Sequence, residues 1–143
     1  MKKLFVIIAI AGLAVLAISL LPLKGPDRDP EMSAIQSLHT VANAMYGRRE
    51  VSNRFPNSFA EVADDLPGDL RKGEKDGYRF SITGTQNSYS ITALPIHYGG
   101  RSKRSFCLDQ SGTLRVSKGP EPANPSSPVL SPSESLRPEQ SGR

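Results

Sequence analysis

The sequence predicts an α+β fold in which the helices come first and an antiparallel meander follows. Apolar residues recur at helical spacing in residues 31–46, whereas they alternate with polar residues in 78–83 and 89–94. The two periodicities occupy separate parts of the chain, so the helices and the sheet are expected to be segregated rather than interleaved.

An uncharged apolar run at residues 4–23 precedes this domain and is flanked by lysines. A helix of about 20 such residues spans a hydrocarbon core, so we expect an N-terminal transmembrane helix at residues 1–23 and a linker at 24–30. The flanking bases favour a single-pass protein of the inner (cytoplasmic) membrane with its C-terminal domain in the periplasm. The alternative is a secretory signal cut at the small-x-small site formed by Ala17 and Ser19.

An amphipathic helix is predicted at residues 31–46. Asp29 is a plausible N-cap, Pro30 suits the first helical position, and Gly47 is expected to end the helix. One apolar stripe runs along this helix and predicts its core-facing side: Ala34, Ile35, Leu38, Val41, Ala42 and Met45.

A short second helix is expected after residue 58. Ser58 and Glu61 have the spacing of a capping box, and Pro67 with Gly68 would end the helix. The charged segment that follows, residues 68–76, is interpreted as a loop.

Four strands then complete the predicted globular domain, which extends over residues 31–118. They are the alternating segments 78–83 and 89–94, followed by 104–109 and 113–116 with a turn at Asp109 and Gly112. The tail at residues 119–143 is rich in proline and serine and poor in large apolar residues, so it is predicted to be disordered.

The connection between the second and third strands is the candidate partner-contact loop. Exposed loops often carry binding residues, although a solvated hairpin connection is the simpler interpretation. The candidate contact residues are Ile96, His97, Tyr98, Arg101 and Lys103.

The sequence shows no motif for catalysis, a cofactor or a metal. Cys107, His39 and His97 are the obvious reactive candidates, and no local pattern links them. The net charge of +4 comes with bases and acids intermixed, which argues against a nucleic-acid partner. We therefore expect a non-enzymatic protein, with an enzyme that uses Cys107 and a histidine as the least favoured alternative.

The order of an apolar N-terminal segment, an amphipathic helix, a short helix and a meander resembles type IV pilins and type II secretion pseudopilins. Residues 31–46, 75–82 and 104–116 are similar to segments of pilin-like proteins of the acidobacterial type. This resemblance implies a pilin-like domain whose partners are envelope or filament proteins.

The chain also departs from that family's pattern. It lacks the prepilin cleavage motif, and Phe5 stands where the family has a glutamate. Pro26 and Pro30 predict a break between the apolar segment and the next helix, where the family has a continuous one. The expected function is thus a membrane-tethered, extracytoplasmic domain with a structural or interaction role in the bacterial envelope. The alternatives are a minor pilin or pseudopilin that enters a filament, and a secreted binding protein released by signal peptidase.

Overall fold

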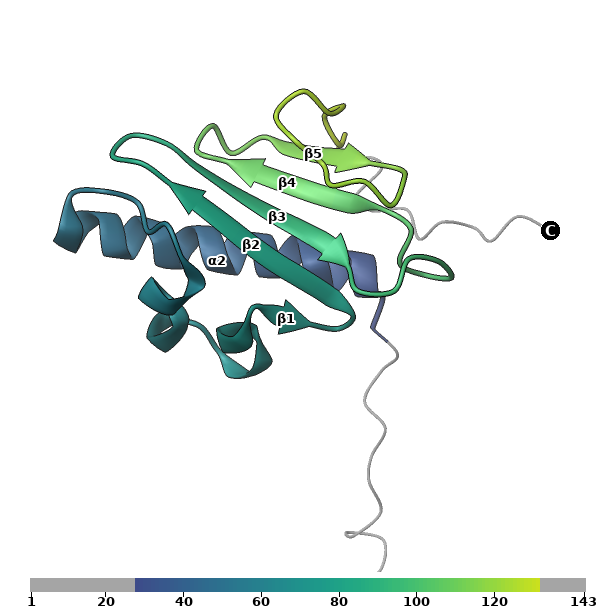
Figure 1. Cartoon of the computed structure of the whole chain (residues 1–143), viewed down its shortest axis with the longest axis horizontal. Helices are drawn as coiled ribbons and strands as arrows, with labels where there is room; N and C mark the ends of the chain where they lie inside the picture. Colours follow the sequence, from purple (N-terminus) through teal and green to yellow (C-terminus); the bar gives the residue numbers. More distant parts are fainter. Residues whose placement is uncertain (1–27, 132–143) are drawn as a thin grey trace, which may run out of the picture.

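The computed structural model describes residues 28–131, which form one long α-helix and a five-stranded antiparallel sheet (Figure 1). The helix lies across one face of the sheet, so the domain has two layers. The elements, in chain order, are α2 (Pro30–Ser52), η1 (Phe59–Glu61), η2 (Ala63–Asp65), η3 (Gly68–Lys72), β1 (Glu74–Lys75), β2 (Tyr78–Gly84), β3 (Tyr89–Pro95), β4 (Ser105–Asp109) and β5 (Leu114–Ser117).

The α2 helix begins where the sequence indicates and ends later. The side chain of Asp29 accepts a hydrogen bond of 3.0 Å from the Glu31 amide, and Pro30 opens the first turn. The helix continues through Gly47 to Ser52, where Asn53 adopts a left-handed conformation and its amide bonds to the Arg49 carbonyl at 2.7 Å. The predicted stop at Gly47 is wrong because a better C-cap lies six residues further on.

The sheet is a meander in which every neighbour in space is also a neighbour in sequence. The sheet has one strand more than the four that the sequence predicts. This additional strand, β1, lies within residues 68–76, which were predicted to form a charged loop. Lys75 pairs with Tyr78 across Asp76 and Gly77, both of which have positive φ, at 49° and 84°. This is the geometry of a two-residue type I′ hairpin, for which Asp-Gly is a preferred sequence. The Asp-Gly dipeptide was the available signal for this strand.

The core lies between α2 and the inner face of the sheet. The predicted apolar stripe of α2 is buried, and side chains that alternate along β2, β3 and β4 meet it. The fully or nearly fully buried members from the strands are Tyr78, Phe80, Tyr89, Ile91, Ala93, Phe106, Leu108 and Val116.

The predicted second helix is instead a series of 3-10 turns, η1 to η3. Ser58 makes no side-chain cap, so the predicted capping box does not form. The Glu61 carboxylate instead accepts from the Asn57 amide at 2.6 Å and from the Arg54 guanidinium at 2.6 Å. Leu66 and Pro67 separate η2 from η3, and each turn is too short to propagate α-helical bonding.

The membrane part of the predicted fold class is also corrected. Within residues 28–131 no helix is long and apolar enough to cross a membrane. The transmembrane helix and the single-pass inner-membrane location inferred from it are therefore not features of the described fold. The predicted anchor at residues 1–23 lies outside the described residues, and so do Ala17 and Ser19 of the predicted cleavage site.

The chain does not leave the domain at residue 118, where the sequence predicts a disordered tail. Residues 119–131 run beside β5, and the side chains of Ala123 and Leu130 are buried. Leu130 belongs to the main core. The rest of the predicted tail, residues 132–143, lies outside the described residues.

Candidate interaction site

The predicted contact loop, residues 96–103, projects from the end of the sheet next to the N-terminus of α2 (Figure 1). The Ile96 amide donates to the Gly77 carbonyl at 2.9 Å, which fixes the start of the loop on the β1–β2 turn. At the tip, Gly99 and Ser102 exchange two backbone hydrogen bonds of 3.1 and 3.0 Å. Gly99 and Gly100 have φ of 129° and 58°, so the tight turn needs two glycines.

The end of the loop is held by one carboxylate from α2, that of Glu31. Its Oε1 accepts from the backbone amides of Lys103 and Arg104, each at 3.1 Å. Its Oε2 accepts from the Nε and Nη2 of the Arg104 guanidinium, each at 2.7 Å. The carboxylate is thus surrounded by four donors, which is what a charge with 6% exposure needs in order to stay buried.

Neighbouring side chains hold the same region. The phenol of Tyr78 is buried and donates to the Arg104 carbonyl at 2.8 Å. Burial raises the pKa of the Tyr78 phenol above its usual value. The Arg104 guanidinium lies 5.5 Å from the centre of the Phe106 ring, and the Ser33 hydroxyl donates to the Asp76 carboxylate. The loop therefore rests on a base formed by α2, β2 and β4.

The tip of the loop remains open to solvent. His97, Tyr98, Arg101 and Lys103 are exposed, whereas Ile96 is half-buried. Tyr98 keeps 52% of its surface exposed, although its hydroxyl lies 3.5 Å from the Lys118 carbonyl. The exposed part of the loop thus presents one aromatic side chain and two cationic ones.

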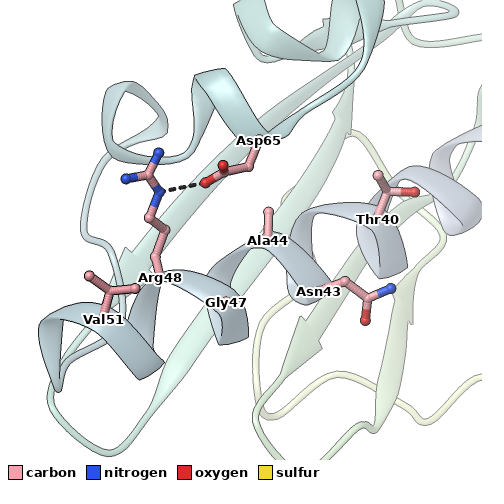
Figure 2. Close-up of a pocket in the computed structure, with 7 residues that line it drawn as sticks. All are labelled: Thr40, Asn43, Ala44, Gly47, Arg48, Val51 and Asp65. Carbon is pink, nitrogen blue, oxygen red and sulfur yellow. Dashed lines mark hydrogen bonds and ion pairs between the residues drawn. The ribbon is translucent and has the colours of Figure 1, made fainter.

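A second candidate is a hollow of about 640 Å³ between the outer side of α2 and η2 (Figure 2). Figure 2 shows Arg48 reaching across to the carboxylate of Asp65, with which it forms an ion pair. The Thr40 hydroxyl donates back to the Gln36 carbonyl at 3.0 Å. The remaining lining residues are Asn43, Ala44, Gly47 and Val51. The Thr40 hydroxyl bonds to a backbone carbonyl and the Asp65 carboxylate pairs with Arg48, so these two groups are not paired as a nucleophile and its base.

The reactive candidates from the sequence are not brought together. His39 is exposed on α2, His97 is exposed on the loop, and Cys107 is buried on β4. The Cys107 thiol lies 3.3 Å from the Ser90 hydroxyl across the β3–β4 pair. In the part of the chain that the structure describes, no group of three or more His, Cys, Asp or Glu residues could hold a metal ion.

No protein-family model, curated protein or solved structure matches this chain. The resemblance to type IV pilins and pseudopilins therefore remains a prediction, and so does the non-enzymatic role.

The sequence identified the loop but missed the residue that positions it. Glu31 follows Asp29 and Pro30 in the first helical turn, where an acidic residue is common because it complements the helix dipole. The sequence gives no sign that Glu31 also holds the end of the loop, because Lys103 and Arg104 are more than 70 residues away in the chain. Only the long-range packing of α2 on β4 shows the contact.

Proposed function

We propose that this domain is a non-enzymatic protein-interaction domain whose contact surface is the loop of residues 96–103. One observation carries the proposal: the loop is fixed at its base by the buried Glu31 carboxylate, yet its tip is exposed. A loop that is already ordered loses little conformational entropy on binding, so more of its contact energy appears as affinity.

The chemistry of the tip favours an acidic protein surface as the partner. Tyrosine and arginine are both enriched at protein interfaces, because each gives a large contact area together with a polar group. Tyr98 and Arg101 provide these two groups, and Lys103 adds positive charge. Such charges accelerate association with an acidic partner and orient the two surfaces.

The resemblance to pilin-like proteins supports a role through protein contacts. A long helix laid over an antiparallel meander matches two of the elements on which that resemblance rests, the amphipathic helix and the meander. We therefore propose a pilin-like interaction domain. Because a fold does not determine a function, this proposal depends on the contact loop and not on the architecture.

The test is site-specific photo-crosslinking of the full chain in cells that make it. A photoreactive residue replaces Tyr98 in one variant and Gln86 in the control. Gln86 is also exposed, but it lies in the turn at the opposite end of β2. We expect a discrete crosslinked protein from position 98 that is absent from position 86. The same product from both positions, or none from position 98, would overturn the proposal.

A further inference from the structure

The turn between β1 and β2 connects the start of the contact loop, residues 96–103, to the rest of the domain. Asp76 and Gly77 form this turn, with φ of 49° and 84°. The Gly77 carbonyl accepts the Ile96 amide at 2.9 Å, and the Asp76 carboxylate accepts the Ser33 hydroxyl of α2. Figure 1 shows the turn at the end of the sheet, beside the first turns of α2. A chemical change in this turn would therefore reach the contact loop.

The sequence of the turn is the one most prone to a spontaneous rearrangement of the main chain. In an Asp-Gly pair, the glycine nitrogen attacks the Cγ of the aspartate, and glycine has no side chain to obstruct the approach. Asp76 is the only aspartate in this chain that glycine follows. The other aspartates precede arginine, proline, aspartate, leucine or glutamine, all of which are bulkier. The rearrangement is therefore expected at one aspartate of the chain.

The rearrangement needs only water. First, a bond forms between the Gly77 nitrogen and the Asp76 Cγ, while the nitrogen loses its proton and the protonated carboxyl group loses its hydroxyl, and the two leave as water. Water then opens the five-membered imide ring at either of its carbonyl carbons. Opening at Cγ restores aspartate. Opening at the α-carbonyl carbon gives isoaspartate, in which the main chain runs through Cβ and Cγ and the α-carboxylate becomes the side group.

The local structure exposes the site and restrains it at one point. Both residues of the turn are exposed, so water reaches the reacting groups. The attack requires rotation about the bond between the Asp76 Cα and its carbonyl carbon, and a following glycine hinders that rotation least. The hydrogen bond from Ser33 restricts the carboxylate, because Ser33 is buried and donates from a fixed position on α2.

Isoaspartate at this position would alter the turn geometry on which the loop depends. It adds one atom to the main chain between Lys75 and Tyr78, which face each other across the turn. A two-residue hairpin turn depends on the number of main-chain atoms between such paired residues. The carbonyl of Gly77 would then no longer face the Ile96 amide. The far end of the loop would stay attached to Glu31, which lies on α2.

We propose that Asp76 is a modification site at which the domain converts spontaneously to isoaspartate. The Ser33 hydroxyl slows the conversion, and the conversion detaches the start of the contact loop. A loop that is free at one end loses more conformational entropy on binding, so the modified domain binds its partner more weakly. Only this last consequence rests on the proposed function.

The first test follows the conversion in the full chain during warm incubation at neutral pH. Isoaspartate is located by enzymatic methylation specific for that residue, followed by peptide mapping. We expect it at Asp76 without a change in mass, and severalfold faster in Ser33→Ala than in the wild-type chain. Thr40→Ala is the matched control, because it removes an α2 hydroxyl that bonds back to the helix itself. Asn57 and Asn87 precede serine and form isoaspartate with a gain in mass, so mapping separates them.

Two results of this test would overturn the proposal. Absence of isoaspartate at residue 76 in the wild-type chain would remove the modification site. Equal rates in Ser33→Ala and Thr40→Ala would remove the restraint by Ser33.

The second test measures amide hydrogen exchange in the modified chain after its chromatographic separation. Exchange of the Ile96 amide should be about tenfold faster than in the fresh chain, the effect of losing one hydrogen bond. Exchange at Lys103 should be unchanged, because Glu31 still holds that amide. Asp76→Glu, incubated identically, is the control, since glutamate would need a six-membered ring and closes far more slowly. Unchanged exchange at Ile96 in the modified chain would overturn the detachment. Neither test involves a partner, so their failure is distinct from a failure of the proposed function.

Discussion

The two ends of α2 are fixed to the sheet by different chemistry. At the N-terminal end, the buried carboxylate of Glu31 binds two amides and a guanidinium near the start of β4. At the C-terminal end, Tyr46, Phe55 and Tyr89 pack edge to face with ring centres 4.9–5.5 Å apart. The aromatic end stabilises the fold through buried apolar area, which does not require one exact arrangement of the rings. The charged end depends on directed hydrogen bonds, so it fixes the position of the loop backbone at Lys103 and Arg104.

The largest effect is expected from Phe55→Ala at the aromatic end. Phe55 is 1% exposed, contacts both tyrosines and lies 4.9 Å from the Arg49 guanidinium. Its truncation should lower the free energy of unfolding by about 4 kcal/mol, measured by chemical denaturation. Exchange of the Lys103 amide hydrogen, at the other end, should stay unchanged under native conditions. If that exchange accelerates as well, the two ends are not independent and the comparison fails.

Glu31→Ala is expected to cause the next largest loss of stability, and it should loosen the end of the contact loop. Removing one partner of a buried ion pair leaves the other unpaired, so we expect a loss of about 3 kcal/mol in the free energy of unfolding. Amide exchange at Lys103 and Arg104 should accelerate, because both amides lose their acceptor. Asp65→Ala is the control: its ion pair with Arg48 is well exposed, so its loss should cost less than about 1 kcal/mol. Equal losses from the two variants would contradict the distinction between buried and exposed pairs.

Alkaline pH provides a milder perturbation that reaches both ends. Burial raises the pKa of the Tyr78 phenol at the charged end and of the Tyr89 phenol at the aromatic end. A raised folded-state pKa means that the stabilisation is complete below the unfolded value of about 10 and is lost as the pH rises above it. Thermal unfolding measured from pH 8 to 11 should therefore show a melting temperature that falls beyond pH 10. Tyr78→Phe and Tyr89→Phe should each make the melting temperature fall less steeply above pH 10. If the fall is as steep in both variants as in the wild-type chain, these two phenols are not its cause.

The parts of this fold that follow local rules could be predicted from the sequence. The apolar stripe of α2 and the alternation in β2 and β3 each reflect a periodicity contained in one segment. Other elements were harder to place, because more than one nearby residue could begin or end each of them. These elements are the C-cap of α2, the 3-10 turns and β1. Gly47 competed with Asn53 for the helix end, and the Asp76–Gly77 turn was concealed within a run of charges.

Contacts distant in sequence escaped prediction altogether. Leu130 lies in a segment whose composition is typical of disorder, yet its side chain completes the core beside β5. Composition averages over a segment, so it does not reveal a single buried leucine or the two backbone hydrogen bonds beside it. For the candidate site, the loop was visible as an exposed connection, but the role of Glu31 depends on tertiary packing. Periodicity carries no information on such a contact.

The smallest effect, and the only stabilising one, is expected beside the aromatic end. Gly47 lies inside α2, and a Cβ added there meets nothing within 4 Å. Gly47→Ala should therefore raise the free energy of unfolding by up to about 1 kcal/mol, because alanine loses less backbone entropy than glycine in a helix interior. Gly84→Ala is the contrasting control, since its Cβ would lie 2.0 Å from the Pro56 carbonyl oxygen and should destabilise the domain. A loss of stability in Gly47→Ala would mean that α2 does not continue through residue 47.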